Sequence, residues 1–180
     1  VCDIDNTLFD QNSGIPKANI EAIQSLHQAG ITVALASGRS YHAMKIVVDA
    51  LQLSDHCAYV IASNGAHIIE TKTQKVLYQK THPVDTLKHY AQVAKELGID
   101  FACEQADVLY HTHDNESVRY ERELCGMKTK LLTDFEFELT QSASKIMMQV
   151  NPLSLGLEMD VFVQRFKHEV SCERFHKTYM

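Results

Sequence analysis

Two acidic residues near the N-terminus are the first feature that could do chemistry. Asp3 and Asp5 interrupt an apolar run, and Thr7 follows them. Residues two apart share a face of a strand, and a backbone that turns at the strand's end can aim both side chains at one point. Converging carboxylates repel each other unless a cation or a proton intervenes. The pattern suits Mg²⁺, a hard cation that prefers oxygen ligands, and it equally fits an exposed turn with two solvated acids.

Two more polar segments follow apolar runs further along the chain. Ser37-Gly38-Arg39 comes after the run 31–36, and Asn64-Gly65 comes shortly after the run 59–62. In an open parallel sheet, ligands bind at the carboxyl ends of the strands. A phosphate is well bound by a hydroxyl, by backbone that a glycine lets approach closely and by the N–H groups at the start of a helix. Ser37 could also be a serine that only caps the following helix. Together, the three segments favour a phosphate site.

The elements that must position these segments alternate between strands and helices. Buried strands are expected at 1–4, 31–36 and 59–62, with helices that begin at Pro16 and after Ser40. This alternation predicts right-handed βαβ units in a parallel sheet. The unbroken apolar run of the second strand predicts that both of its faces are covered.

The second part of the chain mixes short strands with helices. A hairpin is expected at 66–78, and a helix from about Pro83 to Gly98. The remaining expected elements are strands at 100–103, 108–112 and 145–150, helices at about 116–124 and 157–166, and β structure at 169–175 and 178–180. This pattern indicates an α+β module on a parallel core, with a junction near 79–82. We therefore expect one domain at 1–80 and a second at 81–180.

The composition bounds the class of protein. The chain has 180 residues, of which 45% are hydrophobic and 22% charged, as in an ordinary globular protein. Its net charge of −6 argues against a nucleic-acid partner, and no apolar run is long enough to span a membrane. The five cysteines are scattered without a C-x-x-C pair, which favours reduced thiols in the cytoplasm. The oligomeric state does not follow from the sequence.

The three polar segments resemble motifs of a known enzyme superfamily. Segment 3–8, D-I-D-N-T-L, resembles the D-x-D-x-T motif I of the haloacid dehalogenase superfamily, with a mild departure at Asn6, where the family most often has Gly. Segment 36–39, A-S-G-R, resembles its motif II, and segment 61–66, I-A-S-N-G-A, is similar to the I-x-x-N-G-A turn of the Cof-type phosphatases. The motifs lie within residues 1–70, and the remainder resembles the family by pattern only.

The resemblance implies a fold and a set of catalytic roles. The fold would be α/β, a partial doubly wound, Rossmann-like parallel core with an inserted α+β cap of the C2 type. Asp3 would attack phosphorus to form an aspartyl-phosphate and would bind Mg²⁺. Asp5 would protonate the leaving group, activate water and bind Mg²⁺ through its backbone carbonyl. Ser37 and the backbone N–H groups near Ile4 and Gly38 would hold the phosphoryl oxygens.

The resemblance also implies where the substrate lies. Arg39, Asn64 and Gly65 would stand on the rim that faces the cap and would contact the substrate. The implied function is Mg²⁺-dependent hydrolysis of small phosphorylated metabolites, such as sugar phosphates. A phosphomannomutase-like or sucrose-phosphatase-like member stays open, because the cap sequence does not decide between them.

Two parts of the family's catalytic machinery are not found in these 180 residues. The family carries a motif III lysine after its cap and a motif IV acidic cluster of G-D-x-x-N-D type, and Lys177 lacks the strand and helix that would follow such a lysine. We therefore expect the chain to be the first two-thirds of a Cof-type phosphatase, without the C-terminal part of the core and impaired as a catalyst. The alternative is a non-catalytic remnant that acts as a binding or interaction module.

A histidine-containing segment of the second part is a weaker candidate site. His111 and His113 are two residues apart, with Glu104 and Asp107 nearby. A metal site needs neutral imidazoles at suitable distances and a supporting shell of hydrogen bonds. Exposed polar residues or substrate contacts are therefore the favoured interpretation. His67, which follows the Asn-Gly turn, is expected on the surface of the hairpin.

Overall fold

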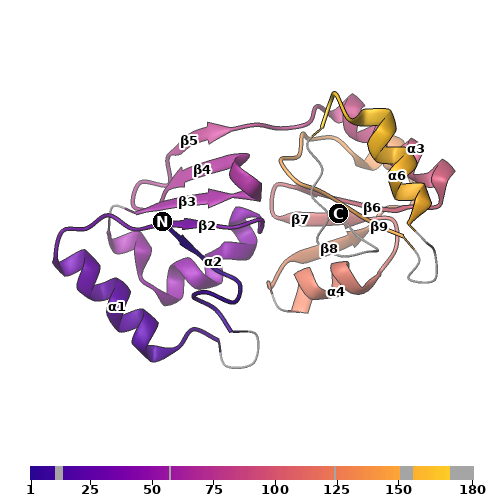
Figure 1. Ribbon diagram of the computed structural model, residues 1–180. Helices are drawn as coiled ribbons and strands as arrows, with labels where there is room; N and C mark the ends of the chain where they lie inside the picture. Colours follow the sequence, from indigo (N-terminus) through magenta and orange to yellow (C-terminus); the bar gives the residue numbers. More distant parts are fainter. Residues whose placement is uncertain (11–13, 57, 124, 151–155, 171–180) are drawn as a thin grey trace. The chain divides into compact units, whose positions relative to one another are not determined.

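The chain folds into two compact units, Val1–Lys80 and Thr81–Met180, in this computed structural model (Figure 1). The residues that the structure describes are 1–10, 14–56, 58–123, 125–150 and 156–170. Among them, no helix is both long enough and apolar enough to cross a lipid bilayer. The mixture of helices with parallel and antiparallel strands confirms the α/β class that the sequence predicts.

The first unit is built on a five-stranded sheet with the strand order β1-β2-β3-β4-β5. The strands are β1 (Cys2–Asp3), β2 (Ala34–Ala36), β3 (Tyr59–Ala62), β4 (His67–Glu70) and β5 (Val76–Gln79). The first three are parallel, and β4 and β5 add an antiparallel hairpin. The connections between the parallel strands contain α1 (Lys17–Gln28) and α2 (Tyr41–Ala50). Because of these crossovers, β1, β2 and β3 all end at the same edge of the sheet.

The core of the first unit lies on one side of β2. Leu35, in the middle of this strand, is fully buried and belongs to a cluster with Val60 of β3 and Met44 of α2. The residues on either side of Leu35 are only partly buried. Ile31 lies outside the strand and is 51% exposed. The expected strand over 31–36 is therefore shorter than its apolar run, and β2 alternates between a buried and a partly buried face.

Two histidines stack where α1 ends. His27 is in the last turn of α1, and His56 follows a short 3₁₀ helix, η1 (Leu53–Asp55). Their ring centroids are 4.1 Å apart and their planes differ by 10°. Nε2 of His27 is buried and makes no hydrogen bond within the described part of the chain. Burial, with a smaller effect of the His56 charge, lowers the pKa of His27 below its usual value.

Acidification should weaken the first unit through this stacked pair. Because the folded pKa of His27 lies below the unfolded value of about 6.5, the unfolded chain binds the proton more readily. The stabilisation by neutral His27 is complete above about pH 6.5 and is lost as the pH falls from there through the folded pKa. We expect urea unfolding to show a smaller stability loss between about pH 7.5 and about pH 5.5 for His27→Gln than for the wild type. The exposed His168→Gln is the control, and an unchanged pH dependence in His27→Gln would contradict the prediction.

The second unit is built on a four-stranded sheet with the order β8-β7-β6-β9. Its strands are β6 (Asp100–Gln105), β7 (Val108–His111), β8 (Lys128–Leu131) and β9 (Ile146–Gln149), and its helices are α3 (Val84–Leu97), α4 (Glu116–Glu123), α5 (Phe135–Glu138) and α6 (Leu157–Phe166). Of these four described strands, β7 and β8 pair in parallel, and β6 pairs antiparallel with both β7 and β9. Residues 169–170 are not in a strand, and the rest of the β structure expected at the C-terminus lies outside the described residues.

Helices pack on both faces of the second sheet. On one face, Phe101 of β6 joins the aromatic rings of α3 and α6, where Tyr90 and Phe166 have centroids 4.7 Å apart. Ala102 points to the opposite face because side chains alternate along a strand, and there it contacts Val118 of α4. The second sheet is thus covered by helices from two directions.

An ion pair links α4 to the segment before β9. Nζ of Lys145 lies 2.8 Å from Oε1 of Glu121. The side chain of Glu121 is 8% exposed and that of Lys145 is 19% exposed. A carboxylate buried to this degree depends on its cation, because burying an unpaired charge is costly.

Candidate active site

The chain turns sharply where β1 ends. The carbonyl oxygen of Ile4 accepts hydrogen bonds from the N–H groups of Thr7, Leu8 and Phe9, at 2.8 to 3.2 Å. Asn6 has a left-handed backbone, with φ of 59°. Asparagine tolerates this conformation better than most residues other than glycine. The turn therefore explains why Asn is a mild replacement for Gly in the first motif.

The loop after β2 orients the hydroxyl of Ser37. Ser40 is the N-cap of α2, and its Oγ accepts the N–H of Ala43 at 3.3 Å. Oγ of Ser37 accepts the N–H of Arg39 instead, at 3.1 Å. The interpretation of Ser37 as a helix cap is therefore wrong. A hydroxyl that accepts one bond can still donate its own hydrogen, so Ser37 keeps a donor for a ligand.

The turn after β3 is tied to the loop after β2. Ser63, Asn64 and Gly65 form the 3₁₀ turn η2 (Ser63–Gly65) and all have positive φ, at 51°, 54° and 89°. The N–H of Ser63 donates to the carbonyl of Arg39 at 2.8 Å, and the N–H of Asn64 donates to the carbonyl of Ser37 at 3.3 Å. Left-handed backbone at non-glycine residues costs energy and clusters at functional sites.

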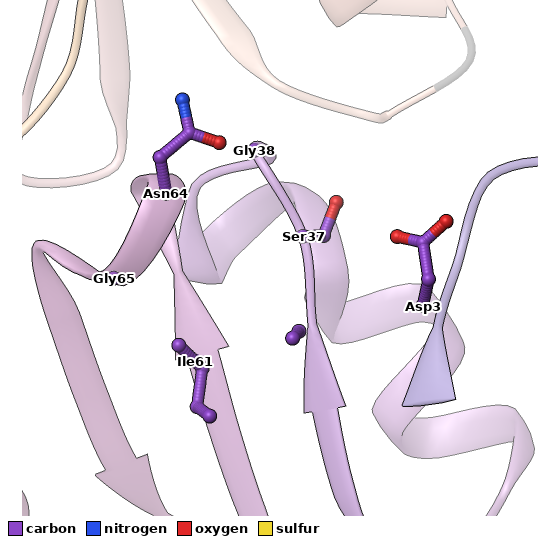
Figure 2. A pocket seen from close by; sticks show the side chains of 7 residues that line it. Asp3, Ser37, Gly38, Ile61, Asn64 and Gly65 are labelled. Carbon is purple, nitrogen blue, oxygen red and sulfur yellow. The ribbon is translucent and has the colours of Figure 1, made fainter. Parts of the chain in front are cut away.

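A cavity of about 340 Å³ opens at the edge where the parallel strands end (Figure 2). Its lining residues are Asp3, Ala36, Ser37, Gly38, Ile61, Asn64 and Gly65. Figure 2 shows the Asp3 carboxylate, the Ser37 hydroxyl and the Asn64 amide all beyond the strand ends, while Ile61 lies further back along β3. One cavity thus brings together residues from all three polar segments of the sequence.

Arg39 engages the carboxylate of Asp5. Nε of Arg39 lies 3.0 Å from Oδ2 of Asp5, and Nη2 lies 2.6 Å from Oδ1. The Arg39 side chain is 6% exposed and that of Asp5 is 32% exposed. Neither residue lines the cavity, and nor does Ile4, although the structure describes all three. Arg39 was expected on a substrate-facing rim, which stays a prediction, and the structure shows its side chain paired with Asp5.

The oxygen atoms at this edge suit a magnesium ion. Asp3 is exposed, and its Oδ2 accepts the Thr7 hydroxyl at 3.3 Å. Within the described ranges, no three His, Cys, Asp or Glu side chains gather as a metal-binding group. Mg²⁺ nevertheless keeps several waters and needs only one or two protein carboxylates beside a substrate phosphate. The carboxylate of Asp3, which lines the cavity, is the side-chain group that fits such an ion, and the family resemblance implies the backbone carbonyl of Asp5 as a second ligand.

The histidines that the sequence analysis singled out, His111, His113 and His67, do not line the cavity. His111 is buried, and burial lowers its pKa, whereas His113 is exposed. The neighbouring Asp114 pairs with Arg122, at 3.1 Å. His67 is partly buried rather than on the hairpin surface, with its ring 6.2 Å from that of Tyr41. Burial, with a smaller effect of the His42 charge, lowers the pKa of His67.

Sequence relatives of the chain are hydrolases and phosphatases by name. The family model of the haloacid dehalogenase-like hydrolases matches residues 1–180. The Bacillus subtilis (strain 168) protein named "Putative phosphatase YxeH" is 27% identical over 95 residues, which cover 53% of this chain and 35% of that protein. A Mycoplasma pneumoniae protein named "Putative phosphatase" is 25% identical over 119 residues, which cover 63% of this chain and 40% of that protein. The matched region thus spans 40% or less of the length of these relatives.

Solved structures share the fold. A haloacid dehalogenase-like hydrolase from Bacteroides thetaiotaomicron superposes with a TM-score of 0.88 at 18% identity, covering 98% of this chain and 67% of that one. The HAD subclass IIB sugar phosphatase BT4131 superposes with a TM-score of 0.75 at 19% identity, covering 98% and 66%. Together with the family model that matches along its whole length, this shared fold shows that the chain belongs to the haloacid dehalogenase-like hydrolases.

Proposed function

We propose that the protein is a Mg²⁺-dependent phosphatase that hydrolyses small phosphorylated metabolites, such as sugar phosphates, through an aspartyl-phosphate. The observation that carries this proposal is the cavity lined by both Asp3 and Ser37. Covalent phosphoryl transfer needs a nucleophile beside hydrogen-bond donors that receive the charge of the transition state. Family membership and the names of the relatives support the same reaction.

The reaction would take place in two displacements at phosphorus. A carboxylate oxygen of Asp3 attacks phosphorus, the bond to the leaving oxygen breaks, and Asp5 gives that oxygen a proton. Water then attacks phosphorus, Asp5 takes up its proton, and inorganic phosphate leaves with Asp3 restored. Arg39 donates one hydrogen bond to each oxygen of the Asp5 carboxylate. The transferred proton would therefore bind an Asp5 oxygen at a lone pair that does not face Arg39.

The remaining cavity residues would bind the phosphoryl group and the substrate. The Ser37 hydroxyl and the backbone N–H groups near Ile4 and Gly38 would donate to the phosphoryl oxygens, where the transition state gathers charge. Bound Mg²⁺ would neutralise part of that charge. Asn64 and Gly65, on the opposite wall from Asp3, would contact the substrate (Figure 2). The second unit would serve as the cap domain.

The size of the cavity supports a small substrate. At about 340 Å³, it is near the lower end of the range of roughly 300–1,000 Å³ for small-molecule sites. One solved structure of this fold is named a sugar phosphatase. Small phosphorylated metabolites are therefore the substrate class that we propose.

Hydrolysis of 4-nitrophenyl phosphate tests the proposed function. With Mg²⁺ we expect phosphate release, and with EDTA a fall of about a hundredfold, because a metal's charge stabilisation is worth several kcal/mol. Adding excess Mg²⁺ should restore the rate, which separates metal removal from denaturation. A rate of phosphate release with Mg²⁺ that is no higher than the rate in buffer alone would contradict the proposed phosphatase activity. A rate that EDTA does not change would contradict the dependence on Mg²⁺.

A further inference from the structure

The proposed reaction steps assign no role to Arg39, although this residue contacts Asp5. Its side chain is almost fully buried, and its guanidinium carbon lies 5.3 Å from the centre of the Phe9 ring. Two of its nitrogens donate to the two oxygens of Asp5. A planar guanidinium fixes a carboxylate in both position and orientation, which a lysine cannot do.

The backbone of Arg39 is anchored by the same segments that line the cavity. Its N–H donates to Oγ of Ser37 at 3.1 Å, and its carbonyl accepts the N–H of Ser63 at 2.8 Å. The side chain then reaches from the end of β2 to the turn after β1. Arg39 therefore links all three strand ends, and the location of Asp5 is set by the loop after β2 as well as by its own turn.

We propose that Arg39 is a positioning residue, which acts on the reaction through Asp5 and makes no contact with the substrate. This inference rests on the proposed function. Asp5 is one-third exposed on a turn, so its side chain could take other rotamers once Arg39 is removed. Proton transfer requires the carboxyl within hydrogen-bond reach of the leaving oxygen, and a displacement of about 1 Å can cost on the order of a hundredfold in rate.

A direct substrate contact fits the geometry less well. Arg39 does not line the cavity, and its side chain is only 6% exposed. Asp5 occupies two of the five N–H groups of the guanidinium, and a phosphate would have to reach the others on a side chain that is almost fully buried. The two roles differ in what they predict for kcat and KM, because a positioning residue affects the chemical step and a substrate contact affects binding.

A double-mutant cycle between Arg39 and Asp5 separates these roles. We measure kcat and KM for 4-nitrophenyl phosphate with Mg²⁺ in Arg39→Met, Arg39→Lys, Asp5→Asn and Arg39→Met/Asp5→Asn. Arg39→Met should lower kcat by about 10- to 100-fold with KM within about twofold, and Arg39→Lys should recover little of the loss. When Asp5→Asn is already present, Arg39→Met should change kcat by less than about twofold. The control, Lys45→Met, removes an exposed cation of α2 that pairs with Asp49 and should leave kcat unchanged.

Each outcome of the cycle has a distinct meaning. An unchanged kcat in Arg39→Met, or an equal loss with and without Asp5→Asn, overturns the positioning role while the proposed function stands. A raised KM with an unchanged kcat makes Arg39 a substrate contact instead. If Arg39→Met does not fold, Arg39→Lys decides, because it keeps the charge and should still lose kcat. A wild type without Asp3-dependent turnover overturns both the function and this inference.

Discussion

Replacing Asp3 with asparagine should lower kcat for 4-nitrophenyl phosphate by on the order of a thousandfold or more, as loss of a covalent nucleophile does in other enzymes. Asp3 is the acidic residue that lines the cavity, which it shares with Ser37, and Figure 2 shows both side chains beyond the ends of their strands. An amide is a far weaker nucleophile than a carboxylate, and it has no charge to offer a metal ion. Both consequences reduce turnover, while the shape of the side chain is almost unchanged.

The matched control for this substitution is Asp49→Asn. Asp49 lies in the same unit, on the exposed face of α2, and pairs with Lys45 at 3.1 Å. Its replacement should change kcat by less than about twofold, because exposed ion pairs are worth about 1 kcal/mol or less and Asp49 does not line the cavity. A rate in Asp3→Asn that matches this control would remove Asp3 as the nucleophile. Thermal unfolding of both variants establishes that the comparison is made between folded proteins.

Local pattern was sufficient for the elements with strong apolar periodicity. Helix α6 was predicted with its observed bounds, and β3 likewise, because apolar residues and flanking polar residues mark their ends. The shared edge of β1, β2 and β3 followed from connectivity alone, since parallel strands joined by helices end on the same side. That is why the sequence alone places Asp3 and Asn64, which are 61 positions apart, near one another.

Elements without an apolar pattern were missed. β8 reads K-T-K-L and lies at the edge of its sheet, where three of its four residues are exposed, so it shows no alternation of apolar and polar residues. α5 has only four residues, which is too short for helical periodicity to appear. β8 is held by its pairing with β7, whereas α5 is capped locally by Asp134, whose side chain accepts the N–H of Glu136.

The pairing of Arg39 with Asp5 could not be read from the sequence either. The two residues are 34 positions apart, and their contact depends on how the loops after β1 and β2 turn. These turns depend on the left-handed backbone of Asn6 and on Ser40 as the N-cap of α2. The sequence does not show that Asn6 is left-handed, nor that Ser40 rather than Ser37 caps the helix. The motif predicted which residues gather at the edge, whereas the contacts among them required the folded backbone.

Removing the cation of the buried ion pair should produce the largest loss of stability among these substitutions. Lys145→Met leaves the carboxylate of Glu121, which is 8% exposed, without its partner 2.8 Å away. Breaking a buried pair at one side typically costs about 3–5 kcal/mol, and because Lys145 is still 19% exposed we expect about 3 kcal/mol. Urea unfolding, followed by a probe in the second unit, measures the change in the free energy of unfolding.

Two comparisons distinguish the cost of leaving the Glu121 carboxylate unpaired from the cost of losing the packing of the Lys145 side chain. Lys128→Met breaks the pair with Asp107, whose partners are 73% and 45% exposed, and should cost less than about 1 kcal/mol. Adding Glu121→Leu to Lys145→Met should recover part of the loss, because the buried carboxylate is then gone and an apolar side chain takes its place. If the double variant is as unstable as the sum of its single changes, the two residues are not coupled. The cost would then come from packing around the Lys145 stem, and the ion pair would add nothing to the stability of the second unit.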